Sequence, residues 1–350
     1  MNKILVSTGY MGSGSSAITD LLAEFKDCSN EHKSYEYVML HCPNGLFDLE
    51  DKLLKGNNAI RSDEAIRSFE LQMNKLYDKK FWWVGNYKNI ISPNFKKITK
   101  DYISHIQEFN YHGYWYMHEE VDMKMFLKLL FRKPFKIIFK NHHFNVITKY
   151  DDGMRISYIN DSDFYKYSHD YIYRVIDEIA KKDENIILDQ FLLPFNLYRI
   201  DNYFDDNLRV IVVERDPRDV FILNKYIWNT KNIGVPLPTD VLEFCKFYKK
   251  MRESEHQTTS KKVLRIKFED LIYQYDKELD KIIKFIGFNK KDHVNPKKRF
   301  DPSLSIKNTQ VFRDSKYTEE IKIIEKELAS YLYDFPYEVS NDVINTVEFE

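Results

Sequence analysis

The sequence predicts an α/β domain with a mainly parallel central sheet flanked by helices. Several short apolar runs are rich in Ile and Val and end in polar or turn residues, a pattern typical of buried strands. Segments with helical spacing of apolar residues lie between these runs. Such alternation is characteristic of a parallel sheet covered by helices. The 350 residues are also enough to bury a large core.

The expected elements follow one another along the chain. The first strand is followed by a helical pattern that includes Ile18 and Leu21. A later helical pattern stops at Gly287, which is well suited to the position after a helix. The segment Tyr150–Asp163 has the character of a loop or hairpin. The predicted strands are Lys3–Thr8, Phe135–Lys140, Asn185–Asp189, Arg209–Glu214 and Lys262–Phe268.

One long segment departs from the strand–helix alternation. From about residue 31 to residue 132 the pattern is mostly helical, with aromatic clusters around Trp82 and Trp115. We expect one domain over residues 1–350, in which 31–132 is a helical, aromatic-rich insertion after the first βα unit. This insertion would pack beside the sheet.

Composition narrows the possible ligands and the compartment. The 53 basic and 54 acidic residues nearly cancel, which argues against binding to duplex nucleic acid through a basic surface. Three scattered cysteines suit a reducing compartment better than a disulfide framework. The histidines lack the H-x-x-x-H spacing of a helical metal site, so we expect no metal. Because no run suggests a membrane span or a signal peptide, we expect a cytoplasmic protein.

A glycine-rich turn follows the first predicted strand. Residues 9–16 have the sequence Gly-Tyr-Met-Gly-Ser-Gly-Ser-Ser and lead into a helix. Glycines let the backbone approach a ligand closely, and free N–H groups at a helix start point toward an anion. The alternative is a tight turn that needs glycine only for its shape. The residues expected to bind a phosphate are Gly12, Ser13, Gly14, Ser15 and Ser16.

This turn nearly fits the nucleotide-binding pattern G-x-x-x-x-G-K-[ST], with Gly9 and Gly14 as its glycines. Ser15 occupies the lysine position, however. Since NTPases place that lysine on the β- and γ-phosphates, its replacement argues against a kinase or an NTPase. The predicted strand that ends at Asp189 could imitate the magnesium-binding acid of such enzymes, but this feature is common in strands.

A second candidate anion site lies at Arg215. An apolar strand delivers this arginine at its carboxyl end, where α/β sheets bind ligands. Asp216 suits an N-cap, Pro217 the first helical position and Asp219 the third, as a capping-box analogue. A guanidinium fixed there can bind a phosphate through two parallel hydrogen bonds. The alternative is a structural ion pair of Arg215 with Asp219 or Glu214.

Together these blocks resemble the PAPS-dependent sulfotransferase family. The Gly/Ser turn, the Arg-Asp-Pro-Arg-Asp turn at Arg215 and the later Glu269-Asp270-Leu271 run, with a helix that stops at Gly287, are similar to that family's signatures. The resemblance implies a P-loop-like fold with the 5′-phosphosulfate at Ser13–Ser16 and the 3′-phosphate at Arg215. It also implies PAPS as co-substrate, PAP as product and no metal.

The sequence departs from the family pattern at three places. Gly12 stands where many members have Lys or Arg, and Leu223 stands where a serine usually binds the 3′-phosphate. We expect Asn224 to act as the substitute ligand. A basic loop that closes on the nucleotide is not obvious. Its candidates are Lys297, Lys298, Arg299 and Lys307.

The predicted strand before Asn141 ends in a way that resembles the family's Lys-x-His strand. On that alignment Lys140 would neutralise the transferring group and His142 would take the acceptor proton. Histidine suits this role because its pKa lies near neutrality. His143 is the alternative base, and Glu36 is a weaker carboxylate candidate in the insertion.

The resulting expectation is a sulfotransferase that moves a sulfuryl group from PAPS to a hydroxyl or amine of a bacterial polysaccharide or glycolipid. The insertion 31–132 would then cap the acceptor side. One alternative is an inactive nucleotide-binding or assembly module, which Gly12 and Leu223 would mark. The other is a P-loop kinase, which Ser15 disfavours.

Overall fold

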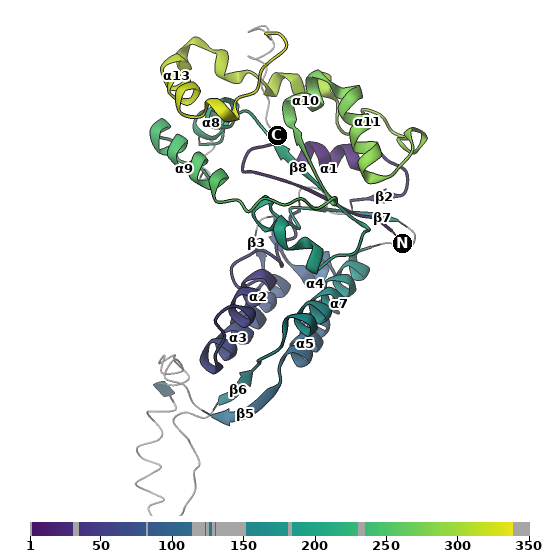
Figure 1. Ribbon diagram of the computed structural model, residues 1–350, viewed down its shortest axis with the longest axis vertical. Helices are drawn as coiled ribbons and strands as arrows, with labels where there is room; N and C mark the ends of the chain where they lie inside the picture. The colour runs from purple at the N-terminus through teal and green to yellow at the C-terminus, as the bar shows by residue number, and fades with distance from the viewer. Residues whose placement is uncertain are drawn as a thin grey trace, which may run out of the picture.

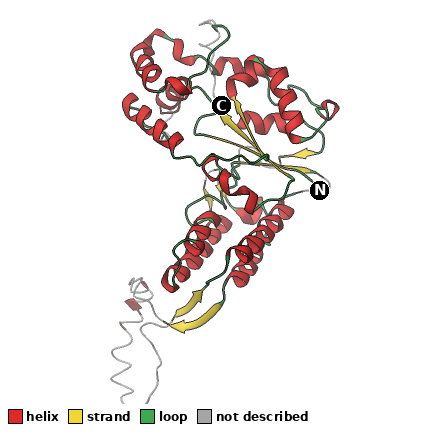
Figure 2. Cartoon of the chain, in the orientation of Figure 1, coloured by secondary structure: helices red, strands yellow, loops and turns green. Residues whose placement is uncertain are grey.

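The computed structural model describes residues 2–30, 35–81, 83–113, 152–180, 184–229 and 235–338, and four single positions between 123 and 130. A five-stranded parallel sheet lies at its centre, with helices on both faces (Figure 1, Figure 2). The predicted α/β fold is therefore confirmed. In spatial order the strands are β2 (Cys28–Ser29), β7 (Asn185–Asp189), β1 (Ile4–Gly9), β8 (Leu208–Glu214) and β9 (Val263–Lys267).

Four of the predicted strands agree with β1, β7, β8 and β9 to within one residue at each end. The fifth, Phe135–Lys140, lies outside the described residues. The two-residue strand β2 was not predicted, because so short an element carries no periodicity.

The sheet buries a different set of side chains on each face, since successive strand residues point in opposite directions. Val6 and Leu188 pack into the core beneath one layer of helices. Their neighbours Leu5 and Ile187 belong to the core on the other face. Burial on both faces explains why the strands are almost continuously apolar.

One face of the sheet is covered by what we call the helical layer (Figure 1). Its helices share a core with the sheet. Four of them lie within residues 31–132, which agrees with the helical character predicted for that segment. The fifth, α7, lies beyond that range, and the predicted limits of the insertion remain a prediction. The helices are α2 (Leu46–Leu54), α3 (Ala59–Asp78), α4 (Tyr87–Ile90), α5 (Phe95–Ile106) and α7 (Asp161–Ile179).

Two small antiparallel sheets accompany the helical layer. The strands β3 (Lys80–Phe81) and β4 (Val84–Gly85) pair with each other. The strand β5 (Phe109–Gly113) pairs with β6 (Asp152–Ile156). The segment Tyr150–Asp163 was predicted as a loop or hairpin. In the structure this segment contains β6, and the strand that pairs with it is β5, which comes earlier in the chain.

Three described helices share a core with the other face of the sheet (Figure 1). Gly287 ends α11 at a φ of 74°, as predicted. No helix in the described ranges has the length and apolar composition that a membrane span requires. The helices on this face are α1 (Ser16–Leu22), α10 (Phe268–Tyr273) and α11 (Tyr275–Ile286). The helices α8 (Pro217–Ile222), α9 (Val241–Glu253) and α13 (Thr318–Glu327) pack against one another in a separate buried cluster. The short helix α12 (Pro302–Ser305) lies between α11 and α13 in the sequence.

Short helical turns complete the described chain. The segment η3 is a π-helical turn that continues α8, and the others are 3₁₀ turns. They are η2 (Pro194–Asn202), η3 (Leu223–Trp228), η5 (Lys290–Asp292), η6 (Ile306–Asn308), η7 (Val311–Arg313), η8 (Ser315–Tyr317) and η9 (Ala329–Tyr331).

The order of the strands in the sheet indicates where a ligand site is expected. The chain runs from β1 to the β2 edge of the sheet, and it later returns to place β8 on the opposite side of β1. Ligands of parallel α/β sheets bind at such a switch point, outside the carboxyl ends of the strands. The ends of β1, β7 and β8 therefore meet at one edge.

Candidate functional site

The glycine-rich turn joins β1 to α1. Gly12 and Gly14 have φ angles of 79° and 82°, in the left-handed region that favours glycine. A Cβ atom on Gly14 would lie 2.9 Å from the ring of Phe268, and one on Gly12 would lie 3.0 Å from the ring of Trp228. Both glycines are thus required by backbone conformation and by close aromatic neighbours.

Arg215 contacts this turn directly. It follows β8 and is only 7% exposed. Its Nη1 donates a hydrogen bond of 3.2 Å to the carbonyl oxygen of Gly12, and its Nη2 donates to the carbonyl oxygen of Asn308. The guanidinium lies over the Phe268 ring at 4.7 Å. The structure therefore brings together the two regions that the sequence singled out as anion sites.

Several buried polar atoms around Arg215 lack a hydrogen-bond partner within the described residues. These are Ser13 Oγ, Arg215 Nε, Glu269 Oε2 and Asn308 Oδ1. Buried polar atoms are nearly always paired, so a group of unpaired ones indicates a place where a polar ligand completes the structure. Ser13 Oγ and Arg215 Nε can donate hydrogen bonds, which suits binding of an anion.

Three carboxyl groups act on the pKa of Arg215, although none of them forms an ion pair with it in the described structure. Burial lowers the pKa of Arg215, and Asp219, Glu269 and Asp216 oppose this effect. Burial also raises the pKa of Asp219 to about 7 and that of Glu269 to about 8. Glu214, the other acid considered from sequence, instead pairs with Arg252 at 2.8 Å.

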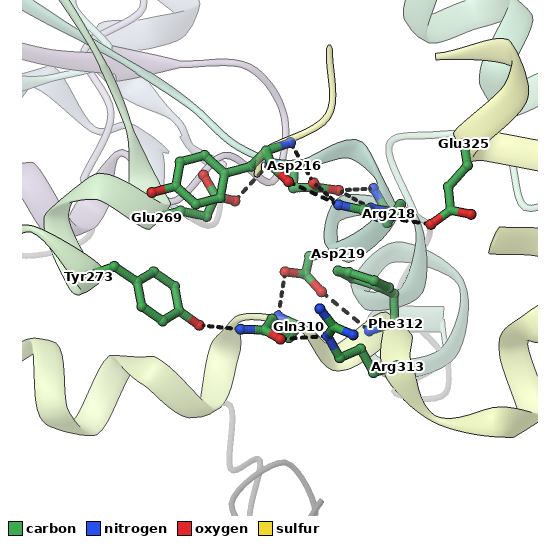
Figure 3. A network of polar contacts seen from close by, with 10 residues as sticks. Asp216, Arg218, Asp219, Glu269, Tyr273, Gln310, Phe312, Arg313 and Glu325 are labelled. Atoms are coloured by element: carbon green, nitrogen blue, oxygen red, sulfur yellow. Dashed lines mark hydrogen bonds and ion pairs between the residues drawn. The ribbon is translucent and has the colours of Figure 1, made fainter. Parts of the chain in front are cut away.

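The turn after Arg215 confirms the predicted helix start and corrects one detail. The Asp216 side chain accepts from Arg218 N, and Pro217 occupies the first turn of α8. The capping-box role predicted for Asp219 is wrong, because its carboxylate accepts from the backbone N–H groups of Gln310 and Phe312 (Figure 3). The backbone N–H of Asp216, which a capping box would satisfy from Asp219, donates to Glu269 Oε1 of α10.

Arg218 fastens this turn to the last part of the described chain. Its guanidinium pairs with Asp216 at 2.8 Å and with Glu325 at 2.9 Å, and it lies 4.1 Å from the Phe312 ring (Figure 3). It also donates to the carbonyl oxygen of Tyr333. This role was not predicted, since Glu325, Phe312 and Tyr333 lie about a hundred positions away and leave no local signal.

Glu24 performs a similar function after α1. Its fully buried carboxylate accepts from the backbone N–H groups of Arg299 at 2.8 Å and Phe300 at 3.0 Å. It also accepts from Lys297 N and lies 2.7 Å from His293 Nε2. The segment that carries the candidate basic residues Lys297, Lys298 and Arg299 is therefore anchored to the end of α1.

The other predicted site residues are placed as follows. Asn224 is fully buried, and its carboxamide donates to Leu237 O and accepts from Leu237 N. Its assignment as a phosphate ligand remains a prediction. The residues Lys140, His142 and His143 lie outside the described residues. Within the described ranges, no group of His, Cys, Asp or Glu is arranged to hold a metal ion.

Glu36, the carboxylate candidate, lies beside the carboxyl end of β7. The backbone N–H of Tyr37 donates to Asp189 O at 3.1 Å. Burial raises the pKa of Asp189 to about 7, and the Glu36 carboxyl adds to this rise. Gln190, the next residue, donates from Nε2 to Ser15 Oγ at 3.0 Å. Glu36 and Asp189 were both considered from sequence, but their proximity to each other and to Ser15 was not predicted.

Comparison with known structures found ten similar chains, of which two are described here. The sulfotransferase domain from the curacin biosynthetic pathway has 12% identity and a TM-score of 0.38, with coverage of 96% of this chain and 99% of that one. The sulfotransferase domain from the Synechococcus PCC 7002 olefin synthase has 16% identity and a TM-score of 0.30, with coverage of 48% and 65%. No curated protein matches.

Comparison with protein families also gives a match. Residues 123–333 match the model of the sulfotransferase domain, which includes Arg215 and Glu269 but not the glycine-rich turn. This match spans more than half of the chain. The chain therefore belongs to the sulfotransferase domain family.

Proposed function

We propose that the protein transfers a sulfuryl group from PAPS to a hydroxyl or amine of an acceptor. The observation that carries this proposal is the contact of the buried Arg215 with the Gly12 carbonyl, amid unpaired buried polar atoms. A nucleotide with a 3′-phosphate and a 5′-phosphosulfate carries two anionic ends. The juxtaposition of an arginine and a glycine-rich turn suits such a donor.

Each region has a role in this proposal. The guanidinium of Arg215 binds the 3′-phosphate, because charge-assisted hydrogen bonds to an anion are stronger than those to a neutral carbonyl. The backbone and hydroxyls of residues 12–16 bind the 5′-phosphosulfate. The Phe268 ring lies under Arg215 and against Gly14, so one side chain packs against both regions.

The reaction places two demands on the remaining residues. Charge that develops on the bridging phosphate oxygen must be neutralised, and the acceptor must lose a proton. The sequence assigns these tasks to Lys140 and to His142 or His143. These assignments remain predictions.

We propose a polysaccharide or glycolipid as the acceptor. Aromatic side chains are exposed on and beside the helical layer, and such rings suit stacking against sugars. They include Phe81, Trp83, Phe109 and Tyr111. All three cysteines are free, which supports a reducing compartment, and we propose the cytoplasm.

Thermal-shift and binding measurements test the donor assignment. The protein should be stabilised by PAP and PAPS, and not by ATP–Mg or GTP–Mg. Arg215→Ala should abolish PAP binding, whereas Arg174→Ala, on the exposed side of α7, should leave it unchanged. Selective stabilisation by ATP–Mg would favour a kinase, and PAP affinity retained by Arg215→Ala would refute the 3′-phosphate site.

A second measurement tests turnover and the acceptor. Labelled sulfate from PAPS should enter a glycan fraction of a cell-envelope extract. A protein that binds PAP but transfers no label would match the inactive nucleotide-binding module.

A further inference from the structure

The carboxyl end of β7 holds a second polar cluster next to the glycine-rich turn. Asp189 is the last residue of β7, and Ser7 of β1 is its partner in the sheet. The Ser7 hydroxyl donates to Asp189 Oδ1 at 3.3 Å and lies 2.5 Å from the Thr19 hydroxyl of α1. The Asp189 carboxyl is therefore fixed on the α1 face of the sheet.

Gln190 connects this carboxyl to the residues expected at the sulfuryl end of the donor. It adopts a φ of 52°, and its Nε2 donates to Ser15 Oγ at 3.0 Å. The Thr8 hydroxyl donates to Gln190 Oε1 at 2.9 Å. Asp189 thus precedes by one residue a side chain that contacts the glycine-rich turn.

Glu36 brings a second carboxyl to the same edge. The hydrogen bond from Tyr37 N to Asp189 O holds the segment around Glu36 along the end of β7. As whole residues, Glu36 and Asp189 are both partly buried and keep some exposure to solvent. Neither of the two carboxyls forms an ion pair within the described parts of the chain.

We propose that Asp189 is the base that takes the acceptor proton and that Glu36 is a positioning residue that tunes it. This inference rests on the proposed function, because it requires the sulfuryl donor to lie against residues 12–16. The acceptor oxygen or nitrogen attacks sulfur and forms the new bond. The bond from sulfur to the 5′-phosphate oxygen breaks, and its electron pair stays on that oxygen. The acceptor proton passes to the Asp189 carboxylate.

The charges around Asp189 support this role. A base works best when its pKa lies near the working pH, and burial with the Glu36 carboxyl raises the pKa of Asp189 to about 7. His41, whose Nε2 lies 2.7 Å from Gln190 O, is the other titratable group here, and burial lowers its pKa. It is therefore neutral near pH 7, so Glu36 is the neighbour whose charge matters. The elements β1 and α1 face Asp189 with the hydroxyls of Ser7 and Thr19.

Labelled-sulfate transfer from PAPS by the full chain, followed from pH 5.5 to 8.5, tests the proposal. Asp189→Asn should lower transfer by roughly 10²–10⁴-fold with unchanged PAP affinity, since a placed base contributes about that much. Glu36→Gln should move the acid limb of the pH profile to lower pH, because loss of the neighbouring carboxyl lowers the pKa of Asp189. Asp201→Asn on η2 is the matched control and should leave the profile unchanged.

Four outcomes decide between the alternatives. Transfer by Asp189→Asn at the wild-type rate would overturn the proposal, as would loss of transfer in His142→Ala alone. If Asp189→Asn fails to fold, an acid limb that does not move in Glu36→Gln overturns it instead. A wild-type chain that neither binds PAP nor transfers label would refute the proposed function and not the choice of base.

Discussion

At the scale of single residues, Arg215 is held by neutral backbone oxygens. Its two terminal nitrogens donate to the carbonyl groups of Gly12 and Asn308, while Nε has no partner in the described structure. A phosphate that binds this guanidinium exchanges carbonyl acceptors for charged ones, and such hydrogen bonds are stronger. The guanidinium is therefore already held in one orientation before any such exchange.

Glu269 gives a prediction for the pH dependence of stability. Burial raises its pKa from an ordinary 4.5 to about 8, so the folded protein binds this proton more tightly than the unfolded chain does. The resulting stabilisation is complete below pH 4.5 and is lost as the pH rises through 8, by up to about 1.4 kcal/mol for each pH unit. Glu269→Gln stays neutral and should show a smaller fall in melting temperature between pH 6 and 9.

The control is Glu319→Gln, which removes an exposed carboxyl on α13. Its melting temperature should follow the wild-type curve. Part of the fall should persist in Glu269→Gln, because the pKa of Asp219 is also raised, to about 7. Parallel curves for wild type and Glu269→Gln would show that Glu269 is charged in the folded protein.

At the scale of elements, the buried Glu24 carboxylate is a main connection between the end of α1 and the segment 293–300. Glu24 accepts several backbone N–H groups of that segment, and no second acceptor of this kind serves them in the described structure. The backbone there also pairs in an isolated bridge between Phe25 and His293. The position of the basic residues at 297–299 thus depends on a carboxylate more than 250 positions earlier.

Loss of this anchor should be costly. Glu24→Ala leaves several buried donors without a partner, and we expect it to lower the free energy of unfolding by about 3 kcal/mol or more. Glu319→Ala, an exposed glutamate with one surface ion pair, should change it by less than about 0.5 kcal/mol. Chemical denaturation measures both. Equal effects would show that the segment is held by other contacts.

Elements with a strong local pattern were predictable, whereas contacts between them were not. The strands β1, β7, β8 and β9 are apolar runs between polar boundaries, and Gly287 marks a helix end by its own chemistry. Arg215 was found because it ends a strand. Its contact with Gly12, 203 positions away, and the neighbouring roles of Asp189 and Glu36 depend on strand order, which local periodicity does not report.

At the scale of the whole molecule, the sheet and the helical layer share one core. Val6 and Leu188 from the sheet belong to the same buried cluster as Phe69 of α3 and Tyr171 of α7. The buried Arg199 of η2 adds an ion pair of 2.6 Å to Glu50 of α2. Removal of either layer would therefore expose the apolar face of the other.

This arrangement predicts that sheet and helical layer unfold together. Thermal melts followed by far-ultraviolet circular dichroism and by tryptophan fluorescence should give coincident transitions. PAP should shift both curves by the same amount, since a ligand that binds only the folded state stabilises the entire cooperative unit. Two transitions, of which PAP shifts only one, would show that 31–132 is a separate domain.

The ring of Trp228 gives the molecule a built-in optical probe. It packs where any side chain on Gly12 would lie, at the turn expected to receive the 5′ end of the donor. Indole emission responds to nearby charge, so entry of an anion at this turn should alter the fluorescence of the unlabelled protein. A tryptophan titration would then report occupancy directly, and Trp228→Phe would identify the source of the signal among the four tryptophans.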